Sequence, residues 1–370
     1  MKLRIAKDQL LHGLQTVQNI VGVRSTLPIL SNVLLRAEGK ELKLTATDLD
    51  VTITCSVAAD VQSGGMGTVP VKRLFSIVRE LMVPELEMEF DDKHSLKLTA
   101  GASFYRIMGL AAEEFPPLPK FEEGKRVKLP QGDLAAMLRK TAYAISMDES
   151  RFVLNGIFFV IKGQKISLVA TDGRRLALAE GALPDSEQTE VEFIAPTKAI
   201  NELTRLLQTS GEIEIKWREN QCAFLLQGEQ TAPTTIITKL VEGTYPNYRQ
   251  VIPAESKERV TLSREELLHA LRRVEIMTTE KSNSVKLAFS KNSLAITANT
   301  PELGEGRENL AINYKGADLA VAFNPGYLMD PLKALEDDEI FLELTDELSP
   351  GVLKAATPFL YVLMPMRMSN

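Results

Sequence analysis

The same succession of predicted elements occurs three times in this chain, with a spacing near one third of its 370 residues. Each copy begins with an amphipathic segment, in which apolar residues three and four apart and an acidic start predict a helix. These segments are Asp8–Val21, Asp133–Ile145 and Glu265–Met277. A reaction usually needs one asymmetric site, whereas a ring or array needs equivalent copies, so the repeat predicts an assembly of similar modules.

A β-hairpin is predicted after each of these helices, because short segments of alternating apolar residues flank polar turn residues. The predicted turns are Glu38–Lys40, Lys162–Gly163 and Lys291–Asn292. A second hairpin closes each copy and begins near Leu86, Ile213 and Ile340. The four kinds of element keep their order in all three copies, which chance similarity between unrelated segments would not produce.

Between the two hairpins of each copy, a proline marks the start of a second helix. These prolines are Pro70, Pro196 and Pro325. The glycine-rich segment Ser63–Gly67 before the first of them is predicted to be a flexible linker, and not a phosphate-binding loop. Pro331 lies inside the third of these helices, and we expect it to kink the helix or to place the true start near Asp330.

The repeat predicts an α+β fold of three equivalent domains, each with two helices packed on antiparallel sheets. We expect these domains at residues 1–123, 124–254 and 255–370, joined by short polar seams. If the copies lie side by side, their sheet edges can pair across each seam. A second chain joined head to tail would then close a ring of six copies.

Composition is that of a soluble globular protein, with 44% hydrophobic and 25% charged residues and a net charge of −6. Two cysteines in different copies, Cys55 and Cys222, disfavour a disulfide framework and favour a reducing compartment. Met1–Ile5 belongs to a predicted strand and lacks the apolar core of a signal peptide. Without a run of about twenty apolar residues, we expect no membrane span and a cytoplasmic location.

Basic side chains on the predicted helices would face the hole of such a ring. Phosphates recur every ~1.7 Å along a DNA duplex, so scattered cations always find partners, and these contacts do not select a base sequence. The alternative for each residue is an ordinary solvated helix face. The candidates are Lys72, Arg73, Arg79, Arg139, Lys140, Lys198, Arg205, Arg272 and Arg273.

Five segments distributed over the whole chain carry a resemblance to a known family. They are Arg24–Leu30, Leu154–Gly156, Thr171–Leu176, Tyr245–Val251 and the tail Tyr361–Arg367. They resemble the bacterial sliding clamp, the beta subunit of DNA polymerase III. The resemblance implies the DNA-clamp fold, a head-to-tail homodimeric ring around double-stranded DNA, and a non-catalytic processivity factor that an ATP-driven clamp loader places on DNA.

The resemblance also implies a pocket between the second and third domains for short peptide motifs. Its partners would be the catalytic subunit of DNA polymerase III, the clamp loader, and other polymerases and repair proteins. Leu, Val, Met and Pro suit an apolar cleft, with arginine at its rim, and Met suits a site that accepts several partners. The implied residues are Leu154, Thr171, Gly173, Arg174, Arg175, Leu176, Pro246, Val251, Leu348, Val362, Leu363, Met364, Pro365, Met366 and Arg367. The alternative for the tail is an ordinary last strand.

Two further sets of contacts follow from the resemblance. DNA contacts are expected at Arg24, Arg73, Arg79, Lys198, Arg205 and Arg273. At the dimer contact, apolar anchors would be flanked by opposite charges. There Tyr105 and Ile107 would face Ile276 and Met277, while Arg73 and Arg106 would meet Glu302, Glu305 and Glu308.

The chain departs from the family pattern at several positions. Arg174 stands where many members carry histidine, which gives the pocket rim a fixed charge. Phe152 and Val153 replace residues that are often tyrosine, so a DNA contact through tyrosine hydroxyls is in doubt. Pro350 stands where a small polar residue is common and can alter the peptide preference.

Catalysis is not expected, and neither a cofactor nor a metal is implied. Asp48 and Asp172 occupy matching turns, the third copy has Asn299, and a turn-capping role is favoured. The three histidines are scattered over different elements and form no ligand cluster in the sequence. Two alternatives to the clamp remain open: a three-domain peptide-binding scaffold without DNA encirclement, and a metal-dependent hydrolase that uses Asp48 or Asp172.

Overall fold

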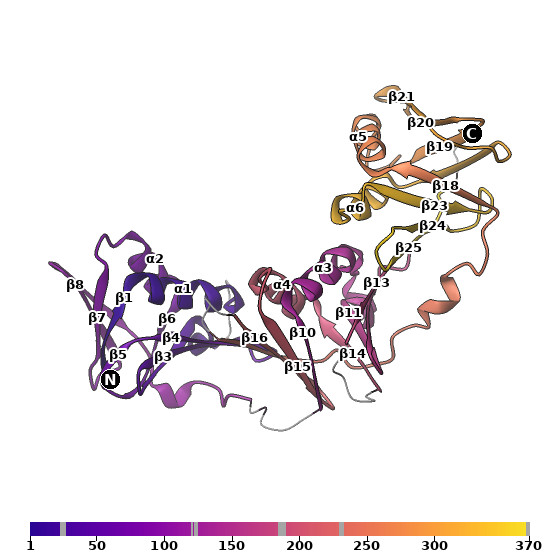
Figure 1. The fold of residues 1–370 in the computed structure, drawn as a ribbon. Coiled ribbons are helices and arrows are strands. Elements are labelled where there is room, and N and C mark those ends of the chain that lie inside the picture. Colours follow the sequence, from indigo (N-terminus) through magenta and orange to yellow (C-terminus); the bar gives the residue numbers. More distant parts are fainter. Residues whose placement is uncertain (23–26, 120, 122–124, 184–189, 229–232, 368–370) are drawn as a thin grey trace. The chain divides into compact units, whose positions relative to one another are not determined.

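A computed structural model describes residues 1–22, 27–119, 121, 125–183, 190–228 and 233–367 (Figure 1). The chain separates into two compact units, one of residues 1–135 with 195–240 and the other of residues 136–194 with 241–370. The second copy of the repeat is therefore divided between the units. Within the described part of the chain, no helix is long and apolar enough to span a membrane.

Copy 1 has the predicted order of elements, and the other two copies repeat it. Its helices are α1 (Lys7–Val17) and α2 (Val71–Glu80). Its strands are β1 (Lys2–Ala6), β2 (Asn32–Glu38), β3 (Glu41–Thr47), β4 (Val51–Ala58), β5 (Asp60–Ser63), β6 (Gly65–Pro70), β7 (Glu85–Phe90), β8 (Ser95–Ala100) and β9 (Ser103–Met108).

Copies 2 and 3 have the same succession, and the residues described in them include no counterpart of β5. Copy 2 consists of β10 (Lys125–Pro130), α3 (Gln131–Thr141), β11 (Gly156–Lys162), β12 (Lys165–Thr171), β13 (Arg175–Ala182), β14 (Glu190–Pro196), α4 (Thr197–Leu206), β15 (Glu212–Arg218), β16 (Gln221–Gln227) and β17 (Thr234–Lys239). Copy 3 consists of β18 (Glu258–Ser263), α5 (Arg264–Glu275), β19 (Val285–Ser290), β20 (Ser293–Thr300), β21 (Gly304–Ala311), β22 (Leu319–Phe323), α6 (Pro325–Ala334), β23 (Glu339–Leu344), β24 (Gly351–Lys354) and β25 (Phe359–Leu363).

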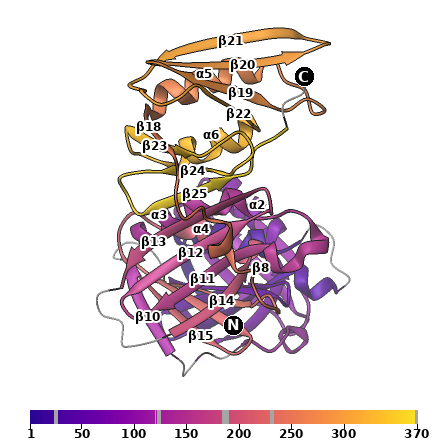
Figure 2. The same cartoon turned by 90° about the vertical axis from the view of Figure 1, so that its right-hand side faces the viewer.

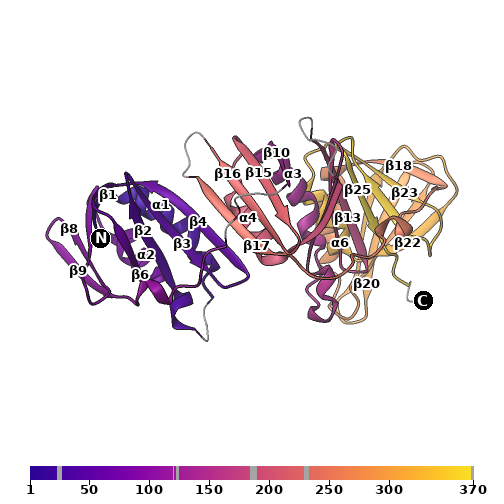
Figure 3. The same ribbon diagram turned by 90° about the horizontal axis from the view of Figure 1, so that it is seen from below.

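Sheets cross the seams between copies, as predicted. In the first unit, β17 pairs antiparallel with β4 and completes an eight-stranded sheet in the order β10-β15-β16-β17-β4-β3-β2-β6 (Figure 3). In the second unit, β25 pairs in the same way with β13, within the order β14-β11-β12-β13-β25-β24-β23-β18. The last strand of one copy thus pairs with the fourth strand of the preceding copy at both seams.

Two smaller sheets are formed by the remaining strands of copies 1 and 3. One has the order β5-β1-β7-β8-β9 and the other β21-β20-β19-β22. Figure 2 shows α5 and α6 beside the strands of copy 3, and α5 packs on β18, β20, β21 and α6. In the equivalent core of copy 1, Leu10 and Leu14 of α1 and Leu74 and Val78 of α2 are fully buried.

The first helix of each copy is shorter than its amphipathic pattern. Helix α1 ends at Val17 and continues as a 3₁₀ turn to Ile20, and α3 ends at Thr141 before another 3₁₀ turn. The hydroxyl groups of Thr16 and Thr141 donate to carbonyls four residues earlier, at 2.9 Å each. Such side-chain bonds compete with continuation of the backbone pattern.

The predicted linker Ser63–Gly67 is wrong, because Ser63 ends β5 and Gly65–Gly67 begin β6, two strands that belong to different sheets. A β-carbon at Gly67 would lie 2.4 Å from the ring of Phe90. A residue without a side chain is therefore needed for the close packing of Phe90, and not for flexibility.

The expected helix start near Asp330 is also wrong. Helix α6 begins at Pro325, where the Asn324 side chain caps it by accepting a hydrogen bond from the Tyr327 amide at 3.1 Å. Pro331 lies inside the helix and has no amide proton to give to the Tyr327 carbonyl. The hydroxyl group of Tyr361 donates to that carbonyl instead, at 2.8 Å.

Candidate functional site

The turn between β12 and β13 is held by its own side chains. Asp172 Oδ1 accepts hydrogen bonds from the Arg174 and Arg175 amides, at 2.9 and 3.1 Å. Gly173 has φ of +85°, a left-handed conformation that favours glycine. In the matching turn of copy 1, Asp48 Oδ1 accepts from the Asp50 and Val51 amides. The turn-capping role predicted for both aspartates is confirmed.

An apolar cluster underlies this turn and includes three of the implied pocket residues, Leu154, Leu176 and Val362. All three are buried, together with Tyr245, whose ring stacks on Phe158 at 4.6 Å between centroids. We call this group of buried side chains the apolar floor of the turn.

Three of the implied pocket residues are exposed apolar side chains: Met364 is 44% exposed, Val251 48% and Leu348 73%. The backbone fixes the tail next to the turn, because the Met364 amide donates to the Arg174 carbonyl at 3.0 Å. Large exposed apolar groups beside an exposed arginine are typical of a surface that binds a partner. Arg174, Pro246, Met366 and Arg367 are also exposed, Thr171 and Pro365 are half-buried, and Leu363 is buried.

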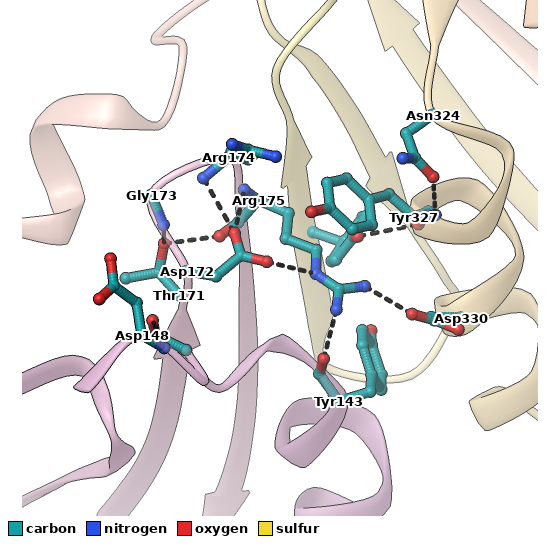
Figure 4. A network of polar contacts seen from close by, with 12 residues as sticks. Tyr143, Asp148, Thr171, Asp172, Gly173, Arg174, Arg175, Asn324, Tyr327 and Asp330 are labelled. Atoms are coloured by element: carbon teal, nitrogen blue, oxygen red, sulfur yellow. Dashed lines mark hydrogen bonds and ion pairs between the residues drawn. The ribbon is translucent and has the colours of Figure 1, made fainter. Parts of the chain in front are cut away.

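Arg175 does not lie at this surface. Figure 4 shows its guanidinium group at the centre of a polar network, and its side chain is only 10% exposed. It bonds the Asp172 carboxylate, the Asp330 carboxylate and the Tyr143 carbonyl. Its Nε, Nη1 and Nη2 each donate within the chain, so the guanidinium group is not a free charge at the rim, and its implied direct contact with a peptide stays a prediction.

The first seam carries an equivalent arrangement with different chemistry. The Lys239 amide donates to the Asp50 carbonyl at 2.9 Å, as the Met364 amide does to Arg174 at the second seam. Here the side chains of Lys239 and Asp50 form an ion pair of 2.9 Å. A cavity of about 120 Å³ beside them is walled by Pro116–Pro119. An ion pair thus stands where the second seam has methionine and arginine.

Two of the six expected DNA contacts are engaged inside the first unit. The ammonium group of Lys198 pairs with Asp48 and also donates to the Ile20 carbonyl at 3.1 Å. The guanidinium group of Arg205 donates to the Gln15 and Thr16 carbonyls at the end of α1, at 3.2 and 2.7 Å. Both side chains tie α4 of copy 2 to copy 1, and Arg205 caps carbonyls of a helix end.

The remaining candidates for DNA contact differ in whether their side chains are paired with carboxylates of the same chain. Arg73 is exposed on α2, while Arg79 on the same helix pairs with Glu80 at 2.9 Å. Arg273 on α5 binds Glu308 on β21 through two hydrogen bonds of 2.8 and 2.7 Å, which lower the pKa of the Glu308 carboxyl. Arg24 lies outside the described residues.

The residues expected at the dimer contact differ in their exposure to solvent. Ile276 is 73% exposed, and Glu302 and Glu305 are exposed, while Met277 is half-buried against the glycines of β21. Ile107 is 3% exposed and belongs to the core of its own chain, because it faces inward on β9 opposite Leu96. It is therefore not available as an anchor.

Sequence reasoning missed two outward apolar residues of β9. Phe104 and Met108 are 57% and 64% exposed, whereas Tyr105, on the inward side, is 37% exposed. The alternation of a strand places residues 104, 106 and 108 on one face and 105 and 107 on the other. That period was the available signal, and it points to Phe104 and Met108 as the large apolar groups of this edge.

Residues that could bind a metal or act as nucleophiles are not gathered at one place in the described part of the chain. Among the described residues, no group of three or more His, Cys, Asp or Glu side chains is placed to hold a metal. Cys55 and Cys222 are free and buried, and burial raises the pKa of both thiols. Phe152 is 57% exposed beside Arg151, whose guanidinium group donates to the Asp172 carbonyl at 3.3 Å.

Comparison with known proteins covers the chain from end to end. Residues 1–119, 128–247 and 249–367 match the N-terminal, central and C-terminal domains of the DNA polymerase III beta subunit. The beta sliding clamp of Chlamydia pneumoniae is 34% identical over 370 residues, with 100% of both chains covered. That of Pseudomonas putida is 32% identical over 372 residues, again with 100% of both chains covered.

Solved structures agree with these relatives. The DNA polymerase III beta subunit of Pseudomonas aeruginosa bound to griselimycin has a TM-score of 0.94 at 32% identity, with 100% of both chains covered. The sliding clamp of Bacillus subtilis has a TM-score of 0.94 at 27% identity, with the same coverage. With its threefold repeat, its two paired seams and these matches, the chain belongs to the family of bacterial beta sliding clamps, the non-catalytic beta subunits of DNA polymerase III.

Proposed function

We propose that this chain is the processivity factor of a bacterial replicative polymerase, and that two copies close head to tail into a ring around duplex DNA. The observation that carries the proposal is the pairing at the seams. The last strand of copy 2 pairs with the fourth strand of copy 1, and the last strand of copy 3 pairs with the fourth strand of copy 2. The same rule leaves β9 and β21 for a second chain.

The end strands fit this rule, since β9 and β21 each stand at the edge of their sheet. A chain with two complementary and different edges can close a ring with its twin through two identical contacts. Exposed apolar groups lie at both, with Phe104 and Met108 on β9 and Ile276 near the start of β21. Each chain would then contribute three equivalent segments, with the limits 1–123, 124–254 and 255–370, and two chains would give the six segments of the ring.

Retention on DNA by topology gives a direct test. The ring, placed on circular and on linear duplexes by a clamp loader, should remain on the circle and slide off the linear ends. Sedimentation should give twice the 40.9 kDa chain mass. A protein of single chain mass, or equal loss from both templates, would favour the scaffold without DNA encirclement.

For DNA, the exposed Arg73 is the candidate best placed to meet phosphates, while Lys198 and Arg205 act mainly within the chain. Replacement of Arg73 by Ala should reduce the salt dependence of sliding-ring retention by about one phosphate contact. The same change at Arg205 should instead loosen the end of α1, which hydrogen exchange would detect. Equal salt slopes for wild type and Arg73→Ala would refute this assignment.

We further propose that the surface formed by the Thr171–Arg174 turn, Val251, Leu348 and the tail Met364–Arg367 binds short peptides; we call it the peptide site. Its partners would be the polymerase catalytic subunit, the clamp loader and repair proteins. Deletion of residues 364–370 should abolish partner binding and leave the mass of the dimer unchanged. We expect one peptide for each chain, because the Asp50–Lys239 ion pair replaces the apolar rim at the first seam. Two peptides for each chain, or binding that survives the deletion, would contradict this proposal.

A further inference from the structure

We propose that Arg175 is a positioning residue whose guanidinium group holds the two walls of the peptide site at the spacing a partner requires. This inference rests on the peptide-binding function proposed above. One wall is the Thr171–Arg174 turn of copy 2, and the other is the tail Met364–Arg367 of copy 3. The guanidinium group of Arg175 connects the two walls.

On the side of copy 2, Arg175 supports the turn from below. Its Nε donates to Asp172 Oδ2 at 3.0 Å, and its Nη2 donates to the Tyr143 carbonyl at 2.5 Å. The other oxygen of the same carboxylate, Asp172 Oδ1, holds the amides of Arg174 and Arg175. Loss of the guanidinium group therefore releases the carboxylate that shapes the turn, and not only one side chain.

On the side of copy 3, Arg175 reaches helix α6. Its Nη1 donates to Asp330 Oδ2 at 2.5 Å, and its guanidinium carbon lies 4.2 Å from the centroid of the Tyr327 ring (Figure 4). The Tyr327 carbonyl accepts the Tyr361 hydroxyl at 2.8 Å. Tyr361 lies on β25, three residues before Met364, so the contacts run without a gap from the turn to the tail.

The chemistry of arginine suits this place. The side chains of Arg175, Asp172 and Asp330 are 10%, 16% and 30% exposed, so the charges are mostly removed from water. A planar guanidinium group can bond three acceptors in fixed directions and stack on an aromatic ring, which an ammonium group cannot do. Removal of one partner leaves the others buried and unpaired.

The neighbouring Arg174 provides a matched control. It lies one residue away, is exposed, and has its backbone carbonyl bonded to Met364. If charge at the peptide site alone mattered, Arg174 and Arg175 would act alike. If position matters, Arg175 and Asp330 should act as one unit, and Arg174 should act separately.

The test measures binding of a fluorescein-labelled clamp-binding segment of the polymerase III catalytic subunit by fluorescence anisotropy. Full-length Arg175→Met and Asp330→Asn should each weaken binding by about three- to thirtyfold, the range of such couplings. The double variant should be no weaker than the worse single variant. Arg174→Met combined with Asp330→Asn should show losses that multiply. The dimer mass should not change in any variant.

Three results would overturn the inference: loss of affinity in Arg175→Met but not in Asp330→Asn, full additivity of that pair, or unchanged affinity in both. The first of these would place Arg175 in direct contact with the peptide. Failure of wild type to bind the segment would refute the proposed function and not the positioning role. That role has a test without ligand, since Arg175→Lys should speed hydrogen exchange of the amides of residues 174, 175 and 364.

If Arg175→Met does not fold, Arg175→Lys replaces it in the binding test, because lysine keeps the charge and loses the planar geometry. An exchange rate of these amides equal to wild type in Arg175→Lys would also overturn the inference.

Discussion

The hydroxyl group of Tyr361 takes the place of a backbone donor that Pro331 cannot supply. The contribution of its hydrogen bond to the stability of the fold can be measured. Tyr361 is 1% exposed and donates to the Tyr327 carbonyl at 2.8 Å. In an uninterrupted helix, the amide of residue 331 would bond that carbonyl. Burial raises the pKa of Tyr361, so its hydroxyl keeps the proton that it donates.

Tyr361→Phe should therefore destabilise the second unit by about 1–3 kcal/mol, the cost of leaving a buried acceptor without a donor. In a Pro331→Ala background, the alanine amide can donate to Tyr327, and the same change should cost about 1 kcal/mol less. The only tryptophan, Trp217, belongs to the first unit. Urea unfolding should therefore be followed by ellipticity. An equal cost of Tyr361→Phe in both backgrounds would refute the reasoning.

Three other outcomes follow from the fold. Gly67→Val should lower the melting temperature, with a cost of about 1–3 kcal/mol for overpacking, because its β-carbon would clash with Phe90 at 2.4 Å; a melting curve like that of wild type would contradict this. Hydrogen bonds from Ser95 lower the pKa of Asp91 to about 2. Asp91 therefore stabilises the fold above its unfolded pKa of about 4, and this contribution is lost as pH falls toward 2. Asp91→Asn should flatten acid unfolding over that window, and an unchanged acid midpoint would count against it. Ile276→Asp should give monomers, and a dimer mass in sedimentation would reject this contact.

Much of the fold could be predicted because it is local. Hairpin turns at Glu38–Lys40 and Lys162–Gly163 lie where the alternation of apolar residues stops, and β2, β3, β11 and β12 flank them. Asp48 and Asp172 could be given a turn-capping role because an aspartate bonds amides two and three residues ahead, whatever the remainder of the chain does.

Other features depended on contacts far apart in the sequence. The Ser63–Gly67 segment looked like a linker because nothing nearby shows that Phe90 packs on Gly67. The period of two on β9 was present in the sequence, but only the pairing with β8 shows which face is covered, and so Ile107 was predicted to be an exposed anchor.

The candidate site also has a part that could be predicted from the sequence and a part that could not. The sequence and its family resemblance identified Arg174, Met364, Val251 and Leu348, and the structure leaves all four exposed on the second unit. They did not show that Arg175, the next residue, turns inward to Asp330, because those residues are 155 positions apart.

By itself, the sequence determined the three copies, the order of their elements and the family, because periodicity and turn chemistry act over a few residues. Only the tertiary structure decided which cations are free to bind a partner. Lys198, Arg205 and Arg175 each meet carboxylates or carbonyls that the fold brings from more than 150 residues away. A charge that is already paired within the chain offers less to an external ligand, and only the path of the chain determines that pairing.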